Sequence, residues 1–189
     1  YIQQKALEIS ECDAILISPV TGIKKTGDFT SNSIIKCYEA LIKSGVYQPS
    51  GVLLSSFNTY SRYSGPREAV FTAICRKNFG CNYFIIGRDH TGIGKTYQTF
   101  EAQKIFETLD LEMDILNFDA VSYCEKRKKV TSDFKNSLYD NSRIELSGSI
   151  IRDLLRSGKD IPEYLMRKEI ADELLSSYKI KKENIFETH

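Results

Sequence analysis

Two segments of the chain carry side chains suited to binding an anion. Gly65–Ala69 leads into the basic Arg76–Asn78, and Gly87–Gly92 (Gly-Arg-Asp-His-Thr-Gly) directly follows the apolar run Tyr83–Ile86. A guanidinium group can bind two oxygens of a phosphate or sulfate, and an imidazole can donate to others. Because α/β proteins bind ligands outside the carboxyl ends of their strands, the second segment predicts an anion site, such as one for a nucleotide.

Gly92–Thr96 contains the Gly-Lys-Thr that ends the phosphate-binding loop of many nucleotide-binding proteins. Such a P-loop needs a first glycine five residues before Gly94, where this chain has Asp89. A carboxylate there repels phosphate and lacks the backbone freedom of glycine. We therefore rank a P-loop phosphotransferase, which would depend on Lys95, below the other hypotheses.

Composition limits the classes of function. The 189 residues include 41% hydrophobic and 27% charged side chains, with a net charge of +1. These values suit one α/β domain with a small appendage and argue against a general binder of nucleic acids or membrane surfaces. The five cysteines form no Cys-x-x-Cys pair, so we predict neither a metal site nor a disulfide framework. No apolar run approaches the roughly 20 residues that span a bilayer, and we expect a cytoplasmic protein.

Apolar periodicity predicts helices that alternate with short strands. The expected helices cover residues 1–10, 31–44, 66–78 and 99–109, and the expected core strands are Ala14–Ile17, Val52–Leu54, Tyr83–Ile86, Met113–Leu116 and Ala120–Tyr123. This order predicts a mostly parallel sheet flanked by helices. Residues 126–141, with the basic run Lys126–Lys129, are expected to be a solvated loop, and Ser147–Ser149 opens a helix to about Arg156. We divide the chain into an α/β domain (1–125) and a loop with a small helical C-terminal subdomain (126–189).

Longer segments resemble the signature of the ATP sulfurylase family. They are Arg62–Ala69, Arg76–Gly80 and Gly87–His90, with further likeness in Pro19–Gly22 and Leu146–Ser149. The likeness runs through nearly the whole chain, in the order of the catalytic region of sulfate adenylyltransferase. It implies a Rossmann-like nucleotidylyltransferase fold (HUP-type). It also implies that a sulfate oxygen attacks the α-phosphorus of ATP, giving adenylyl sulfate and pyrophosphate.

The resemblance also implies roles for individual residues. The ATP contacts it implies are Gly87, Arg88, Asp89, His90, Val121, Ser147 and Gly148. Of these, Arg88 and His90 would be catalytic, and Arg88 would bind sulfate together with Thr91, where the family usually has alanine. Arg62, Arg67 and Glu68 would support the loop before the helix. Mg²⁺ is expected to bind through the ATP phosphates, without a protein ligand.

Several of these residues have structural readings that the sequence leaves open. Asp89 either contacts the ligand or anchors its own loop. Arg62, Arg67 and Glu68 either form an internal ion-pair network or touch the substrate. Ser147–Ser149 is either only a helix cap or also an anion seat. A lone histidine is more often structural, but the place of His90 after a strand end favours a ligand role.

The sequence departs from the family in three respects. The family's Gln-x-Arg-Asn-Pro-x-His-x-x-His motif and the first strand of its sheet are absent; in the family the motif directly precedes the segment that Tyr1 resembles. Thr72 replaces a common histidine, and Cys124 stands alone where some bacterial members cluster cysteines around a metal. Three hypotheses remain. They are the catalytic region of a sulfate adenylyltransferase that is homo-oligomeric when complete, a non-catalytic nucleotide-binding remnant, and a P-loop phosphotransferase.

Overall fold

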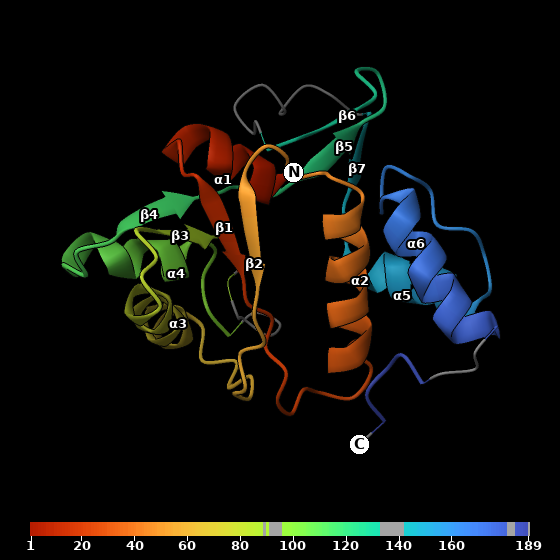
Figure 1. The fold of residues 1–189 in the computed structure, drawn as a ribbon, viewed down its shortest axis with the longest axis horizontal. Coiled ribbons are helices and arrows are strands. Elements are labelled where there is room, and N and C mark those ends of the chain that lie inside the picture. The colour runs from red at the N-terminus through yellow and green to blue at the C-terminus, as the bar shows by residue number, and fades with distance from the viewer. Residues whose placement is uncertain (89, 91–95, 133–141, 181–183, 189) are drawn as a thin grey trace. The chain divides into compact units, whose positions relative to one another are not determined.

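The structure is a computed structural model that describes residues 1–88, 90, 96–132, 142–180 and 184–188 (Figure 1). The chain divides into two compact units. The first comprises Tyr1–Cys12, Ser61–Ala120 and Ser132–Tyr139, and the second comprises Asp13–Tyr60, Val121–Thr131 and Asp140–His189. Both contain helices and strands, which agrees with the α/β class expected from the sequence.

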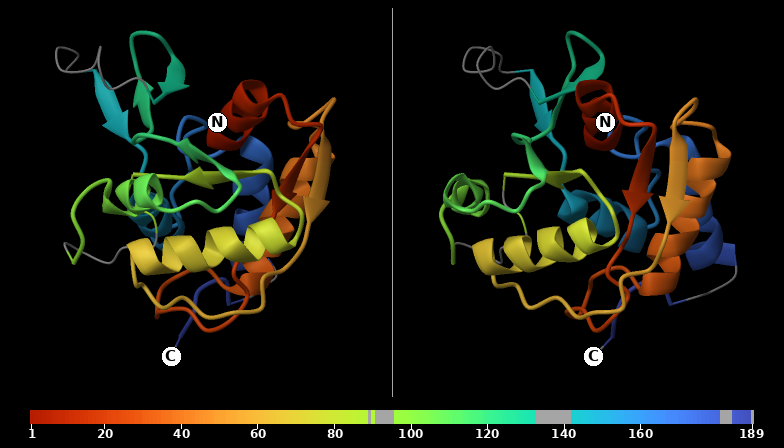
Figure 2. Two further views of the ribbon diagram at one scale, coloured as in Figure 1. Left: turned by 90° about the vertical axis from the view of Figure 1, so that its left-hand side faces the viewer. Right: turned by 60° about the vertical axis from the view of Figure 1, so that its left-hand side comes forward.

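The first unit is built around two parallel strands, β3 (Tyr83–Ile86) and β4 (Asp114–Asn117), which pair in register along their whole length. Its helical elements are α1 (Ile2–Ser10), α3 (Pro66–Asn78), α4 (Glu101–Lys104) and the 3₁₀ turn η1 (Ile105–Thr108). Figure 2 shows α3 running beside β3, and residues of the two elements are in contact.

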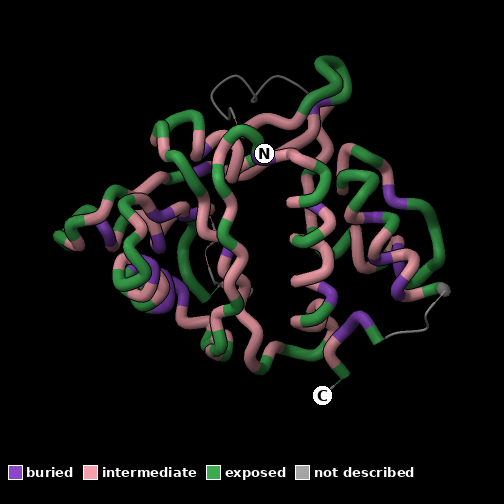
Figure 3. The backbone as a smooth tube through the Cα atoms, viewed as in Figure 1, coloured by how far each residue is buried: buried purple, intermediate pink, exposed green. Residues whose placement is uncertain are grey.

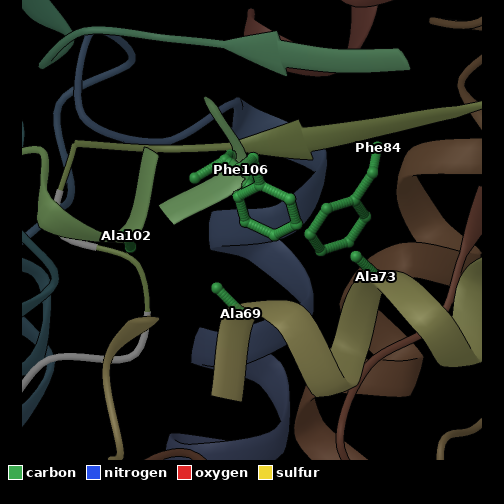
Figure 4. Packing of buried hydrophobic residues seen from close by; sticks show 6 residues of the cluster. Ala69, Ala73, Phe84, Ala102 and Phe106 are labelled. Atoms are coloured by element: carbon green, nitrogen blue, oxygen red, sulfur yellow. The ribbon is translucent and has the colours of Figure 1, made fainter. Parts of the chain in front are cut away.

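Helix α3 has the bounds that the sequence predicts. Pro66 fits the first helical position because its missing N–H has no partner to lose there, and Glu68 places a negative charge near the helix N-terminus. Ala69 and Ala73 lie on the buried face and point toward the rings of Phe84 and Phe106 (Figure 4). Small side chains allow this close approach between helix and strand.

The second unit contains another parallel pair, β1 (Ala14–Ile17) with β2 (Gly51–Leu54), and an antiparallel sheet of three short strands. That sheet has the order β6 (Lys129–Thr131), β5 (Ser122–Cys124), β7 (Arg143–Glu145). The helical elements are α2 (Ser31–Lys43), α5 (Gly148–Arg156), α6 (Lys168–Leu175) and the π-helical turn η2 (Ser176–Ile180).

The core of the second unit lies among its C-terminal elements. Its buried members are Leu155, Ile161, Ala171, Leu174, Ile185 and Phe186. Helices α2 and α6 are in contact, and Phe29, just before α2, packs on Phe186 with ring centroids 5.2 Å apart. Thr30 caps α2 by accepting the N–H of Ser33 at 3.2 Å.

Several details of the secondary-structure prediction were wrong. The described strands form two parallel pairs and one antiparallel sheet, where a mostly parallel sheet was expected. Lys129, predicted to lie in a solvated loop, begins β6 and pairs with Cys124. The strand expected at Val52–Leu54 is not a core strand, because Leu53 is 62% exposed; Figure 3 shows the alternation of exposed and half-buried positions along β2.

The expected helix over residues 99–109 is also different. It divides into the single α-helical turn α4 and the 3₁₀ turn η1. Ile74, expected on the apolar face of α3, is 42% exposed, since that face is narrow and is centred on Ala69 and Ala73. Among the helices of the described residues, none has the length and apolar character that crossing a membrane requires.

Candidate functional site

The carboxyl ends of β3 and β4 lie next to each other in the first unit. Ile86 is paired with Asn117, and Phe118, which follows β4, donates its N–H to the Ile86 carbonyl at 2.8 Å. The segments that leave the two strands, residues 87–90 and 118–120, therefore begin side by side. Parallel α/β sheets bind their ligands at such an edge.

Gln103 of α4 joins these two strand ends. Its Nε2 donates to the Phe118 carbonyl at 2.9 Å and lies 3.5 Å from the Ile86 carbonyl oxygen. Directly before α4, the N–H of Phe100 donates to the Arg88 carbonyl at 3.2 Å. The start of α4 thus fixes the backbone on both sides of the edge. The sequence analysis did not single out Gln103. The only available signal was a polar residue next to Ala102 in a segment expected to be helical.

Gly87 and Arg88 are half-buried and follow β3 directly. A Cβ atom built on Gly87 meets none of the described residues within 4 Å, so their packing does not require glycine there. The described residues therefore leave the space beside this backbone open. Asp89 and Thr91, the predicted ATP and sulfate contacts, lie outside the described residues, and so does Lys95 of the P-loop hypothesis.

His90 packs its ring edge-on against Phe84, with centroids 5.8 Å apart and planes at 76°. Its Nε2 is buried and has no hydrogen-bond partner within the described part of the chain. Burial lowers the pKa of His90 below its ordinary value of 6.5, and the negative charge of Glu68 opposes this shift. At neutral pH the imidazole is therefore uncharged, with one nitrogen available to a polar ligand atom.

Glu68 holds the loop that precedes α3. The residue is 5% exposed, and its two carboxylate oxygens accept the N–H groups of Arg62 and Ser64, each at 3.0 Å. Bonds to an ionised acceptor are stronger than neutral ones, so this pair of contacts fixes the loop firmly. The guanidinium of Arg62 lies 4.8 Å from the centre of the Phe71 ring, and Arg67 is exposed on α3. The Glu68 side chain therefore supports the loop by accepting hydrogen bonds from main-chain N–H groups of the loop.

The remaining predicted ATP contacts belong to the second unit. Ser147 caps α5, because its Oγ accepts the N–H of Ser149 at 3.2 Å. The cap is thereby observed, while an anion-binding role of Ser147 and Gly148 stays a prediction. One turn along, Arg152 donates to the Ser149 hydroxyl at 3.3 Å. Val121, directly before β5, is half-buried.

The described residues contain no group of three or more His, Cys, Asp or Glu side chains arranged to hold a metal ion. Cys124 is buried with its sulfur 3.9 Å from the hydroxyl of Ser142. Mg²⁺ prefers carboxylate, phosphate and water oxygens in octahedral geometry. The described residues therefore show no all-protein cage for this ion.

Asp119, two residues beyond β4, is a second polar residue that the sequence reasoning did not single out. Its Oδ1 is buried and has no hydrogen-bond partner among the residues described. The available signal was an acidic residue directly after Phe118, at the end of an apolar strand. Buried carboxylate oxygens are normally hydrogen-bonded, which makes this position unusual.

Comparison with known proteins places the chain in a family. A sequence model of the ATP-sulfurylase family matches residues 1–177. Curated relatives named sulfate adenylyltransferase include one from Aeropyrum pernix, 42% identical over 178 residues (93% of this chain, 45% of the relative). One from Carboxydothermus hydrogenoformans is 39% identical over 181 residues (94% and 47%), and one from Cenarchaeum symbiosum is 41% identical over 164 residues (86% and 43%).

The sequence matches identify the family, whereas a similar solved structure concerns the fold. The chain spans about half the length of the curated relatives it matches. It also resembles the hexameric APS kinase from Thiobacillus denitrificans with a TM-score of 0.65 and 19% identity, over 93% of this chain and 32% of that one. At this identity the likeness concerns the fold alone. The family match over residues 1–177, joined to identities of 39–42%, shows that the chain belongs to the ATP-sulfurylase family.

Proposed function

We propose that this chain is the catalytic region of a sulfate adenylyltransferase, which converts ATP and sulfate into adenylyl sulfate and pyrophosphate. The observation that carries the proposal is the family match over residues 1–177. The curated relatives bear the name of this enzyme. The placement of Arg88 and His90 beyond β3, at the edge shared with β4, supports it further.

In the proposed reaction a sulfate oxygen attacks the α-phosphorus of ATP. A new O–P bond forms, the bond from the α-phosphorus to the bridging oxygen breaks, and pyrophosphate leaves with the electron pair. Both reactants are anions, so catalysis depends on holding them together and on offsetting their charge. The guanidinium of Arg88 suits the phosphoryl and sulfate oxygens, and the uncharged imidazole of His90 donates one N–H to the same group.

The other parts of the proposal come from the family motif. Gly87, Asp89, Val121, Ser147 and Gly148 are the further ATP contacts, and Thr91 binds sulfate through its main chain. Mg²⁺ enters on the ATP phosphates, since this ion commonly binds through substrate phosphates and water rather than in an all-protein cage.

At the level of fold and assembly, we propose the HUP-type Rossmann-like subtype. Residues 1–125 form the nucleotide domain and residues 126–189 the C-terminal subdomain. The parallel β3–α4–β4 connection supports this subtype. The complete protein in this proposal is a cytoplasmic homo-oligomer.

The test is a pyrophosphate-release assay with Mg²⁺, ATP and sulfate, on the 189-residue chain and on a version extended upstream through the neighbouring coding residues. We expect sulfate-dependent release in the extended version. Arg88→Ala should lower it about 100- to 1000-fold, the usual effect of removing a group that stabilises transition-state charge. Lys104→Ala, an exposed cation on α4, is the control and should retain activity.

Other outcomes select the other hypotheses. ATP binding without turnover in either version would favour a non-catalytic nucleotide-binding remnant. Loss of turnover in Lys95→Ala, with normal turnover in Arg88→Ala, would favour the P-loop phosphotransferase. Sulfate-independent release would contradict the proposed acceptor.

A further inference from the structure

Asp119 is half-buried, and its Oδ1 is buried in a way that the fold itself does not explain. The main chain of its neighbour Phe118 completes the strand pairing through the Ile86 carbonyl and receives the amide of Gln103. The Asp119 carboxylate takes part in neither contact, and its Oδ1 has no partner among the described residues. An oxygen that has lost water without gaining a donor destabilises the folded chain, so its retention calls for a functional cause.

A second buried atom of the same kind lies at the same edge of the sheet. His90 Nε2 also lacks a partner in the described part of the chain, and it follows β3 as Asp119 follows β4. Because Ile86 pairs with Asn117 and Gln103 bridges the two strand ends, both residues emerge from one place in the first unit. Two residues that follow adjacent parallel strands thus each carry a polar atom without a partner in the described part of the chain. This arrangement points to a shared ligand.

Charge decides which part of a nucleotide each residue can meet. Arg88 attracts phosphate oxygens, whereas a carboxylate repels them and binds hydrogen-bond donors or a cation. A phosphate-bound Mg²⁺ would favour ATP and tripolyphosphate alike. A partner that belongs to ATP alone must be a hydrogen-bond donor, and ATP carries such donors only on its nucleoside half. In dinucleotide-binding folds an acidic residue beyond a strand similarly accepts from a ribose hydroxyl.

We propose that Asp119 is a nucleoside contact whose buried Oδ1 accepts a hydrogen bond from an O–H or N–H donor of the nucleoside half of ATP. The inference rests on the proposed function, because it takes ATP to be the ligand at the ends of β3 and β4. It adds a specificity role, since the same carboxylate favours a nucleoside triphosphate over a bare polyphosphate of equal charge.

The experiment compares the binding of Mg²⁺-ATP and Mg²⁺-tripolyphosphate by calorimetry in the wild-type chain, Asp119→Ala and Asp119→Asn. We expect Asp119→Ala to bind ATP about 10- to 100-fold more weakly, as for other charge-assisted bonds of about 1.4–2.8 kcal/mol. Tripolyphosphate should bind equally well or more tightly, because a like charge has been removed. Asp114→Ala, an exposed carboxylate at the other end of β4, should change neither affinity.

Nucleotide analogues identify the donor. 2′-Deoxy-ATP, 3′-deoxy-ATP and purine riboside triphosphate each lack one donor group of ATP. For the analogue that lacks the donor used, wild type and Asp119→Ala should bind with equal affinity, which is the expected result of a double-mutant cycle. If the variant weakens all three analogues as much as ATP, the direct contact is overturned.

Thermal unfolding separates a binding role from a structural one. Removing an unpartnered buried carboxylate should leave the melting temperature unchanged or raise it. A lower melting temperature together with unchanged ATP affinity would show that an ordered water or the fold uses Asp119, and the inference would fail. Asp119→Asn keeps the shape of the side chain and replaces the alanine variant in both measurements if that variant does not fold.

The two proposals fail in different ways. If the wild-type chain binds neither ATP nor tripolyphosphate, the nucleotide site itself is wrong and the role of Asp119 is lost with it. If the wild-type chain binds ATP and Asp119→Ala binds it within twofold, only the assignment of Asp119 is wrong.

Discussion

His90 combines a buried ring with an unpartnered nitrogen in the described part of the chain, and its burial sets its charge. The ring packs on Phe84, and burial lowers the pKa of His90 while Glu68 acts in the opposite direction. Without a bound ligand the lowered pKa favours the uncharged imidazole near neutral pH, which meets a ligand oxygen as an N–H donor. That role depends on which ring nitrogen carries the proton, and the ligand oxygen would select the tautomer.

We predict that His90 titrates below pH 6.5. Imidazole NMR of a His189→Gln variant, in which His90 is the only remaining histidine, measures this directly. Because Glu68 raises the pKa of His90, Glu68→Gln should lower it further. Titration of His90 at or above 6.5 would contradict the buried environment described for its ring.

The same shift makes stability depend on pH. Between the pKa of His90 in the folded chain and its unfolded value of about 6.5, the unfolded chain binds the extra proton. The free energy of unfolding therefore rises with pH through this window. The stability that neutral His90 contributes is complete above the window and is lost as the solution is acidified. Urea unfolding at pH 7.5 and 5.5 should show a larger loss on acidification for wild type than for His90→Gln.

At the scale of elements, α4 sets the geometry of the site although it is only one turn long. Gln103 ties the ends of β3 and β4 together, and the N–H of Phe100 holds the Arg88 carbonyl. Packing of Ala102 and Phe106 against Phe84 anchors this turn in the core. The edge is therefore held by both polar and apolar contacts of one short segment.

We predict that Gln103→Met weakens both the fold and the site. Methionine fills a similar volume but leaves the Phe118 carbonyl without its donor, at a cost of about 1–3 kcal/mol. The melting temperature should fall by several degrees, since about 1 kcal/mol corresponds to about 2–4 °C for a chain of this size. ATP affinity should fall as well, because the strand ends are no longer tied. Lys104→Met, the exposed neighbour, is the matched control.

An unchanged melting temperature in Gln103→Met would show that the amide contributes nothing to the edge. Lower stability with unchanged ATP affinity would show that the strand ends keep their geometry without it. Either result would contradict the role of Gln103 in shaping the site.

The elements also show what local sequence can predict. Pro66, the alanines of α3 and the run Tyr83–Ile86 predicted the correct bounds for α3 and β3 because local signals mark both ends. Strand β6 was missed because a basic, polar segment becomes a strand only by pairing with β5, which is a tertiary effect. The exposure of Leu53 was missed for the same reason, since an apolar run does not reveal which of its faces is covered.

Similar limits apply to the candidate site. Arg88 and His90 were predicted because they follow an apolar strand and match the family motif, and Glu68 because its segment Arg62–Ala69 resembles the family signature. Gln103 and Asp119 were not found, because their importance comes from contacts or missing contacts across two strand ends. Spacing along the chain does not encode such relations.

At the scale of the whole molecule, the family match is far wider than the candidate site. The family match extends over residues 1–177 across both compact units, while two residues with unsatisfied polar groups at the strand ends, His90 and Asp119, belong to the first unit. We therefore expect the first unit to provide the primary nucleotide contacts. The relatives are about twice as long as this chain, so turnover is best judged in the longer version.

The most direct test of the central claim is to map Mg²⁺-ATP binding on the 189-residue chain by amide NMR. We predict saturable shifts at Gly87, Arg88, His90 and Asp119, which disappear in Arg88→Ala and persist in Lys104→Ala. Saturable shifts that leave both strand ends unperturbed, or binding that is unaffected by Arg88→Ala, would contradict a nucleotide site at the carboxyl ends of β3 and β4.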